Sequence, residues 1–239
     1  MKKQTFLHYL GGKWCLAPWI ISHFPFHCCY VEPFGGGGSV LLRKTPAPIE
    51  VYNDINKEIV NLFQVLREDN FKLLQLLRLT PFSREELRRS KTPSILRIEQ
   101  ARRTLIRYRY SRNPERINYD TTIKTSSLRS FSMQWKNFVD NDLPWIIDRL
   151  RSVTIENRDA TKIIDFYDKP DTLYYIDPPY DPKISSITYR SNYSTEQIIS
   201  LSKLLQNIQG FVVISGCRSD LWDNLFSWCI RRDKQTRNA

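Results

Sequence analysis

Apolar residues along this chain follow two patterns: short continuous runs, and longer stretches in which they recur every three or four positions. The short runs predict buried strands just before residue 35 and at residues 49–54, 153–157, 173–176 and 210–215. The longer stretches predict helices in a segment opened by Ser39, then at residues 55–79, after Ser83, and at 94–110, 160–166 and 194–208. Strands that alternate with helices predict an α/β fold with a Rossmann-like sheet.

The run at residues 173–176 ends abruptly in Asp177, Pro178, Pro179 and Tyr180. Neither proline can donate to a strand ladder, so the strand must stop there, at the sheet edge where open α/β folds bind ligands. The Asp177 carboxylate and the Pro178 carbonyl can both accept hydrogen bonds from an amino group on a planar base, while Tyr180 stacks on its ring. An ordinary proline turn is the alternative interpretation of these four residues.

A second candidate site lies where an apolar run feeds four glycines, Gly35 to Gly38. Strand, glycine turn and helix form the nucleotide-binding corner of a Rossmann-like unit. The spacing departs from GxGxxG and no Lys-Ser/Thr follows, which disfavours dinucleotides and nucleoside triphosphates and leaves open an adenosine-containing ligand without a diphosphate. Asp54 follows after about 20 residues, the interval expected of a carboxylate that holds ribose hydroxyls. It could instead cap the helix that starts at Ile55.

Positive charge is concentrated in one segment of the chain. The 239 residues carry a formal net charge of +11, and residues 71–140 contain 16 Lys and Arg against 6 Asp and Glu. Basic side chains neutralise phosphates, so a polyanion partner is expected, with solubility as the alternative. Four arginines of the helix predicted at 94–110, expected to be partly exposed, are either phosphate contacts or a solvated face: Arg102, Arg103, Arg107 and Arg109. Residues 115–140, rich in Ser, Thr and Arg, predict loops.

The cysteines and the lengths of the apolar runs bear on class and location. The five cysteines show neither a CxxC pair nor a zinc-ligand spacing, so no metal is expected. An odd number of cysteines without a recognisable export signal favours reduced thiols and a cytoplasmic protein. The apolar runs fall short of the roughly 18 residues that a membrane-spanning helix needs, so no membrane association is expected.

Four motifs taken together resemble those of the Dam-like DNA adenine methylases, which move a methyl group from S-adenosylmethionine to the exocyclic amine of adenine in DNA. They are Gly-Gly-Lys at 11–13, Glu-Pro-Phe-Gly-Gly-Gly-Gly-Ser at 32–39, Asn-Asp-Ile-Asn at 53–56 and Asp-Pro-Pro-Tyr at 177–180. The resemblance implies a class I methyltransferase fold, S-adenosylmethionine as cofactor and double-stranded DNA as partner. Residues 1–66 and 141–239 would form the catalytic domain, and 67–140 a basic helical insertion that recognises the target.

The resemblance also implies roles for individual residues. Tyr9, Lys13, Asp54 and Asp177 would contact the cofactor, and Asp159 would lie near its adenine. The methionine end of the cofactor would be shaped by Glu32, Phe34, Gly35, Gly36 and Gly37. Residues 177–180 (Asp177, Pro178, Pro179 and Tyr180) would form the catalytic site, with no metal required.

The sequence departs from the family in two places. No stretch of the basic segment matches closely enough to imply the GATC target of the best-known members. After Ile230 the family usually adds two more strands, whereas this sequence closes with a polar, basic stretch, so an unpaired sheet edge, low stability and weak activity are expected. Three alternatives stay open: a relative that binds DNA and cofactor but is catalytically weak, and methyltransferases that act on cytosine amino groups or on adenine in RNA.

Overall fold

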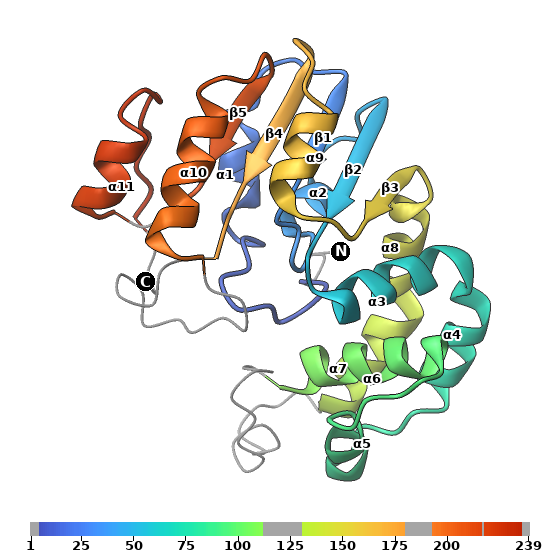
Figure 1. Ribbon diagram of the computed structural model, residues 1–239. Helices are drawn as coiled ribbons and strands as arrows, with labels where there is room; N and C mark the ends of the chain where they lie inside the picture. The colour runs from blue at the N-terminus through green and yellow to red at the C-terminus, as the bar shows by residue number, and fades with distance from the viewer. Residues whose placement is uncertain (1–4, 112–130, 180–192, 217, 236–239) are drawn as a thin grey trace.

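Five parallel strands form a single sheet at the centre of the protein (Figure 1). The computed structural model describes residues 5–111, 131–179, 193–216 and 218–235. The strands are β1 (Cys29–Glu32), β2 (Ile49–Asn53), β3 (Val153–Glu156), β4 (Thr172–Ile176) and β5 (Phe211–Ile214), in the order β3-β2-β1-β4-β5. The chain therefore proceeds outward from β1 on one side and returns to β4 on the other, so a switch point, where such folds bind ligands, lies between β1 and β4.

Helices cover both faces of the sheet, because successive residues of each strand point to opposite sides. On β1, Tyr30 belongs to one apolar core and Val31 to the other, and on β4 Tyr175 and Tyr174 divide in the same way. The first core is covered by α1 (Ala17–Ile21), α2 (Ser39–Arg43), α3 (Lys57–Glu68) and α8 (Leu143–Leu150). The second is covered by α9 (Ala160–Phe166), α10 (Thr195–Leu205) and α11 (Asp220–Leu225). This three-layer arrangement confirms the predicted α/β, Rossmann-like sheet.

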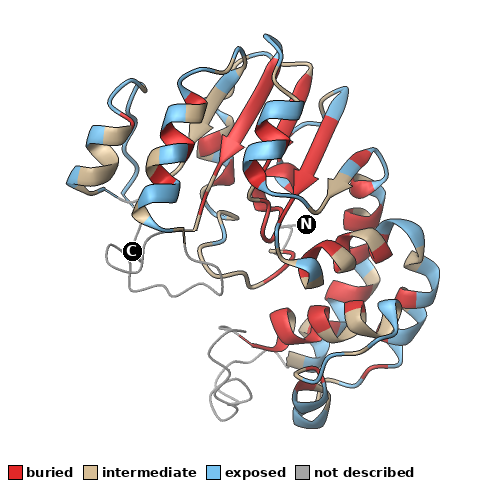
Figure 2. Cartoon of the chain, viewed as in Figure 1, coloured by how far each residue is buried: buried red, intermediate tan, exposed pale blue. Residues whose placement is uncertain are grey.

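A helical lobe extends from the first face and comprises the described residues between 70 and 142. Its elements are α4 (Asn70–Arg78), α5 (Arg84–Arg89), α6 (Arg97–Tyr110), α7 (Phe131–Asn137) and the π-helical turn η1 (Phe138–Asp142). Leu105 and Phe138 of the lobe belong to the same apolar core as Tyr30 of the sheet, and in Figure 2 the buried segments continue from the sheet into these helices. The lobe thus shares its core with the sheet, and its boundaries at residues 67 and 140 stay a prediction.

Two helix predictions are wrong in detail. The stretch 55–79 forms two helices because Asp69 leaves helical geometry, with φ −126° and ψ 29°. The first of them, α3, starts at Lys57 and is capped by Asn56, whose side chain accepts a hydrogen bond from Glu58 N at 3.0 Å. Asp54 is therefore not the helix cap.

The expectation of loops at residues 115–140 is wrong for the part that the structure describes. Residues 131–142 are helical, and the indole of Trp135 is buried, where it donates to the carbonyl of Thr80 over 3.0 Å. Burial of one large aromatic ring anchors a segment whose polar composition predicts a loop.

The strand predicted at residues 210–215 is present as β5, but the prediction that it is buried is wrong. β5 lies at the end of the strand order and pairs with β4, and Phe211 at its start is 44% exposed. Other boundaries agree with prediction: α9 spans residues 160–166, and Ser83 and Ser194 cap α5 and α10. Among the described residues, no helix has both the length and the apolar character needed to cross a membrane.

Candidate active site

The loop after β1 packs directly on the end of β2. Gly35 N donates to Asn53 O over 2.8 Å, and the Tyr52 hydroxyl donates to Gly36 O over 2.7 Å. A Cβ on Gly35 would lie 2.2 Å from the Tyr52 ring, and Gly36 has a φ of +48°, so both positions need glycine. The glycines therefore let the loop fold tightly against the sheet at the switch point.

Asp54, immediately after β2, holds this loop in place. Its carboxylate accepts from Gly36 N and from Asn56 N, each over 2.7 Å, so one side chain bridges the glycine loop and the start of α3. Burial raises the pKa of Asp54, and the backbone N–H donors partly oppose that rise. The structure thus gives Asp54 a second role, in shaping the loop, beside the cofactor contact that the resemblance implies.

Lys13 and Asp177 meet at the carboxyl end of β4 although 164 residues separate them. Lys13 Nζ lies 2.8 Å from both carboxylate oxygens of Asp177 and 2.8 Å from Gly11 O. The Ser215 hydroxyl donates to Asp177 Oδ1 over 2.8 Å. The carboxylate therefore stands at the meeting point of the N-terminal segment, β4 and β5.

Glu32, the last residue of β1, is only 2% exposed. It accepts from the Tyr30 hydroxyl at 3.2 Å and from Leu41 N at 3.1 Å. Burial raises the pKa of Glu32 to about 8, the two hydrogen bonds oppose the rise, and the negative charge of Asp177 adds to it. Near neutral pH this carboxyl group is mostly protonated, and an entering cation would favour its ionised form.

These residues line one cavity of about 230 Å³ between the N-terminal segment and the ends of β1, β2 and β4. Its lining includes nearly every catalytic and cofactor-binding residue that the sequence predicts: Tyr9, Lys13, Glu32, Phe34, Gly35, Gly36, Gly37, Asp54, Asp159, Asp177, Pro178 and Pro179. Asp159 also caps α9, accepting from Thr161 N at 2.9 Å. The remaining residue, Tyr180, lies outside the described residues, so its stacking role stays a prediction.

Other residues line this cavity although the sequence assigns them no individual role in a site. Asn53, Arg158, Tyr175 and Tyr193 line it, and the Tyr193 ring packs edge-on against Phe34 with 5.3 Å between centroids. Tyr193 directly precedes Ser194, the residue that caps α10. The sequence therefore indicates that Tyr193 lies at the start of a helix, but not that it lies at the cavity. Tyr175 lies within an apolar run, and such a run indicates only a residue of the hydrophobic core.

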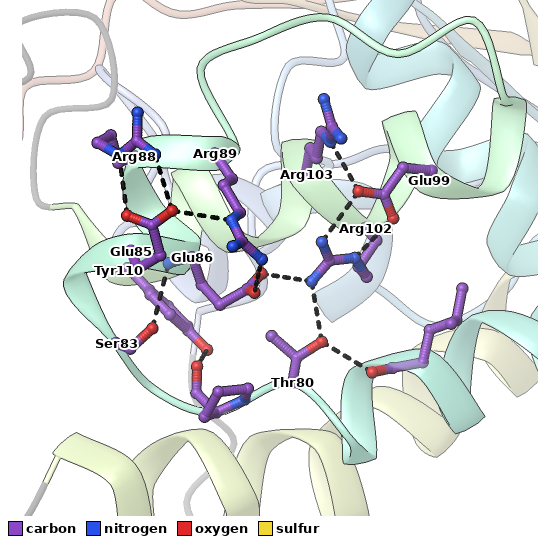
Figure 3. A network of polar contacts seen from close by, with 12 residues as sticks. Thr80, Ser83, Glu85, Glu86, Arg88, Arg89, Glu99, Arg102, Arg103 and Tyr110 are labelled. Atoms are coloured by element: carbon purple, nitrogen blue, oxygen red, sulfur yellow. Dashed lines mark hydrogen bonds and ion pairs between the residues drawn. The ribbon is translucent and has the colours of Figure 1, made fainter.

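The four arginines proposed to contact phosphate all have partners within the protein. Figure 3 shows Arg102 between Glu86 and Glu99, at 2.6 and 2.7 Å, with Arg103 bound to the same Glu99. Arg107 is buried and paired with Glu58.

Arg109, on the same helix, donates to Thr5 O over 2.7 Å, and burial lowers its pKa to about 10. The expectation of partial exposure is wrong for Arg107. The DNA-contact role of the four arginines stays a prediction, and these ion pairs argue against it for Arg102 and Arg107.

A larger cavity, of about 470 Å³, lies between the N-terminal segment and the lobe. Tyr9, Arg109, Tyr110 and Trp135 are among its lining residues. The smaller cavity is the candidate active site, because it gathers the carboxylates and the glycine loop.

A doubly wound parallel sheet with a glycine loop after β1, and with carboxylates at the ends of β1, β2 and β4, is consistent with a Rossmann-like methyltransferase fold. The chain belongs to the D12 class N6 adenine-specific DNA methyltransferase family, whose model matches residues 9–228. The resemblance found in the motifs is thereby confirmed.

Relatives from bacteria and archaea agree with this membership. The DNA adenine methylase of Serratia marcescens is 40% identical over 72 residues, which cover 29% of this chain and 26% of that relative. The type II methyltransferase M1.LlaDCHI of Lactococcus lactis subsp. cremoris is 25% identical over 250 residues, 93% of this chain and 84% of the relative. The type II methyltransferase M.MjaIII of Methanocaldococcus jannaschii is 24% identical over 246 residues, 87% of this chain and 81% of the relative.

Proposed function

We propose that this protein is a site-specific DNA methyltransferase that transfers a methyl group from S-adenosylmethionine to the exocyclic amino group of adenine in double-stranded DNA. The observation that carries the proposal is the single cavity that joins the glycine loop, Glu32 and Asp54 to Asp177 and Pro178. The glycine loop, Glu32 and Asp54 suit a nucleoside-containing cofactor. Asp177 and Pro178 suit an amino group. Family membership supports the same reaction.

The chemistry of the cavity supports S-adenosylmethionine as the cofactor. Four carboxyl side chains line it, from Glu32, Asp54, Asp159 and Asp177, against two basic side chains, from Lys13 and Arg158, among the described residues. Since Lys13 is paired with Asp177, this lining favours a ligand that carries positive charge and hydroxyl groups over one that carries phosphates. When bound, the cofactor supplies an electrophilic methyl group on a sulfonium.

Asp177 and Pro178 would orient the amino group of the target adenine. The carboxylate and the backbone carbonyl each accept one amino proton, which leaves the nitrogen lone pair outside the ring plane and directed at the methyl group. Methyl transfer would form the N–C bond as the S–C bond breaks and would leave a neutral thioether. Asp177 would hold the amino proton that the nitrogen then releases to water. Rate enhancement comes mainly from alignment and from electrostatics in the cavity.

DNA would approach on the side of the helical lobe. An adenine inside a duplex cannot reach a cavity at the sheet edge, so it must leave the stack at a cost of a few kcal/mol. The lobe would repay this cost through phosphate contacts, and the net charge of +11 supports such contacts. Contacts between the protein and the edges of the DNA bases would determine the target sequence.

Nucleoside analysis tests the proposal directly. Duplex DNA is incubated with the purified protein and S-adenosylmethionine, digested to nucleosides and analysed by mass spectrometry, and N6-methyladenine is the expected product. Asp177→Ala, which removes the acceptor of the amino group, should give none while keeping the fold. Methylated cytosine, or methylation of RNA alone, would replace adenine in DNA as the substrate. Cofactor binding without any product from the wild type would indicate a binding protein.

A further inference from the structure

Ser215, the residue directly after β5, is tied twice to the end of β4. Its backbone N–H donates to Ile176 O over 2.9 Å, and its hydroxyl donates to Asp177 Oδ1 over 2.8 Å. The register of the two strands, in which Ile214 pairs with Ile176, places Ser215 beside the first residue of the Asp-Pro-Pro segment. The second link reaches the carboxylate on which the proposed reaction depends.

The Tyr175 hydroxyl extends this contact into a chain of hydrogen bonds. It lies 3.0 Å from Ser215 Oγ. A serine hydroxyl has a single proton, and that proton goes to Asp177, so the Tyr175 hydroxyl must be the donor in the first step. Tyr175 is almost fully buried, and burial raises its pKa well above the usual value, which keeps its proton in place. The direction is therefore Tyr175 to Ser215 to Asp177.

These hydrogen bonds distinguish the two carboxylate oxygens of Asp177. Lys13 lies at the same 2.8 Å from Oδ1 and Oδ2, whereas Ser215 contacts Oδ1. The terminal torsion of an aspartate is broad, so an external contact is needed to hold the carboxylate plane in one orientation. A directed donor on one oxygen meets this need.

Ser215 itself is held by the packing that follows it. A Cβ on Gly216 would lie 2.1 Å from the indole of Trp222, so α11 packs directly on the backbone after Ser215. Ser219 caps this helix by accepting from Trp222 N over 3.2 Å. Among the described residues, the cavity lining includes Tyr175 and Asp177 but not Ser215, which would therefore act through Asp177.

We propose that Ser215 is a positioning residue of the methyl transfer: with Tyr175 it forms a directed relay that orients the Asp177 carboxylate toward the amino group of the target base. This inference rests on the proposed function. It assigns a task to β5, a strand to which the sequence gives no chemistry.

The test compares Ser215→Ala with Ser215→Thr, which keeps the hydroxyl, and with Tyr175→Phe, which removes the outer donor. Single-turnover methylation of duplex DNA, calorimetric cofactor affinity and melting temperature are measured for each. We expect Ser215→Ala to be about 10- to 100-fold slower, the worth of one hydrogen bond to a charged group, with affinity and melting temperature unchanged. Ser215→Thr should recover most of the rate, and Tyr175→Phe should be slower than wild type but faster than Ser215→Ala.

Two results in an active wild type would overturn the relay and leave the proposed function standing. One is a Ser215→Ala rate equal to that of wild type. The other is a loss of rate that is matched by losses of cofactor affinity and melting temperature, which a purely structural serine would produce. If Ser215→Ala does not fold, Tyr175→Phe at the wild-type rate overturns the relay. A folded, cofactor-binding wild type that forms no N6-methyladenine overturns the proposed function and the relay with it.

Discussion

Glu32 is the residue whose ionisation most directly reports on the cavity. Its carboxyl group is buried, and burial together with the negative charge of Asp177 raises its pKa to about 8. Glutamine has a nearly identical shape and can accept the same hydrogen bonds from Tyr30 and Leu41. Glu32→Gln is therefore a matched variant that removes ionisation and little else.

We expect Glu32 to make the protein without cofactor less stable as pH rises. Below its ordinary value of 4.5 the group is protonated both folded and unfolded. Between 4.5 and about 8 the unfolded chain releases this proton and the folded protein keeps it, so the free energy of unfolding falls across that window. Urea denaturation of wild type and Glu32→Gln at several pH values measures the difference, which should shift in favour of the variant as pH increases.

A difference that stays constant with pH would show that Glu32 ionises equally in both states. Calorimetry with S-adenosylmethionine supplies a second check, because a cationic ligand favours the ionised carboxylate. The affinity of wild type should rise with pH up to about 8, by at most about tenfold per unit, more steeply than that of Glu32→Gln.

Twelve of the residues that line the cavity are predictable from the sequence, because their types and spacings carry chemistry by themselves. Lys13, the glycine loop and Asp177 are of this kind. The bond from Gly36 N to Asp54, and the contact between Ser215 and Asp177, depend on strand register and loop conformation. A serine after an apolar run has many ordinary roles, so no pattern in the chain distinguishes Ser215.

At the scale of elements, α5 and α6 are joined by ion pairs that fix the geometry of the lobe. Arg102 on α6 is 12% exposed and reaches Glu86 on α5, Glu99 on its own helix and the Thr80 hydroxyl. Arg88 on α5 is 67% exposed and pairs with Glu85 at the surface. These two arginines have the same chemistry and opposite surroundings.

We expect Arg102→Ala to lower the free energy of unfolding by about 2 kcal/mol or more, because it leaves Glu86 and Glu99 without their shared partner in a poorly hydrated site. Arg88→Ala should change stability little, since water screens its ion pair. Urea denaturation of both variants measures the contrast.

Equal stability of the two variants would contradict a structural role for Arg102. A phosphate contact would show itself differently, through a decrease of about one unit in the salt dependence of DNA binding. Measuring both quantities on the same variant separates the two roles.

Elements were predictable where local pattern and tertiary packing agree. Every residue of β1 and β4, and every residue of β2 after the first, is buried, because helices cover both faces of the sheet. The spacing of apolar residues encodes neither the break at Asp69 nor the π-helical turn at residues 138–142. The edge position of β5 follows from the strand order, which apolar character alone cannot give.

At the scale of the whole molecule, the stacked rings of Tyr9 and Tyr108 connect the cavity to the lobe. Tyr9 lines the cavity and stacks on Tyr108 of α6, with 5.5 Å between centroids and 8° between planes. His8 N donates to Tyr108 O at 3.2 Å in the same region. The N-terminal segment that carries Lys13 is therefore held by a helix of the lobe.

We expect Tyr108→Ala to weaken cofactor binding by about 0.5–1.5 kcal/mol, the worth of an aromatic pair, although Tyr108 is not among the described residues that line the cavity. Tyr108→Phe keeps the stacked ring and should bind nearly as wild type does. Calorimetry measures both affinities. An Ala variant with normal affinity would mean that Tyr9 keeps its position without the lobe.

The pairing of Lys13 with Asp177 also sets when activity can arise during synthesis. The two residues are 164 positions apart, and translation adds about 5–20 residues per second, so roughly ten to thirty seconds pass between them. For most of that interval the nascent chain holds the glycine loop but lacks the Asp177 carboxylate. Under the proposed function, an unfinished chain on the ribosome would therefore be unable to methylate a genome beside it.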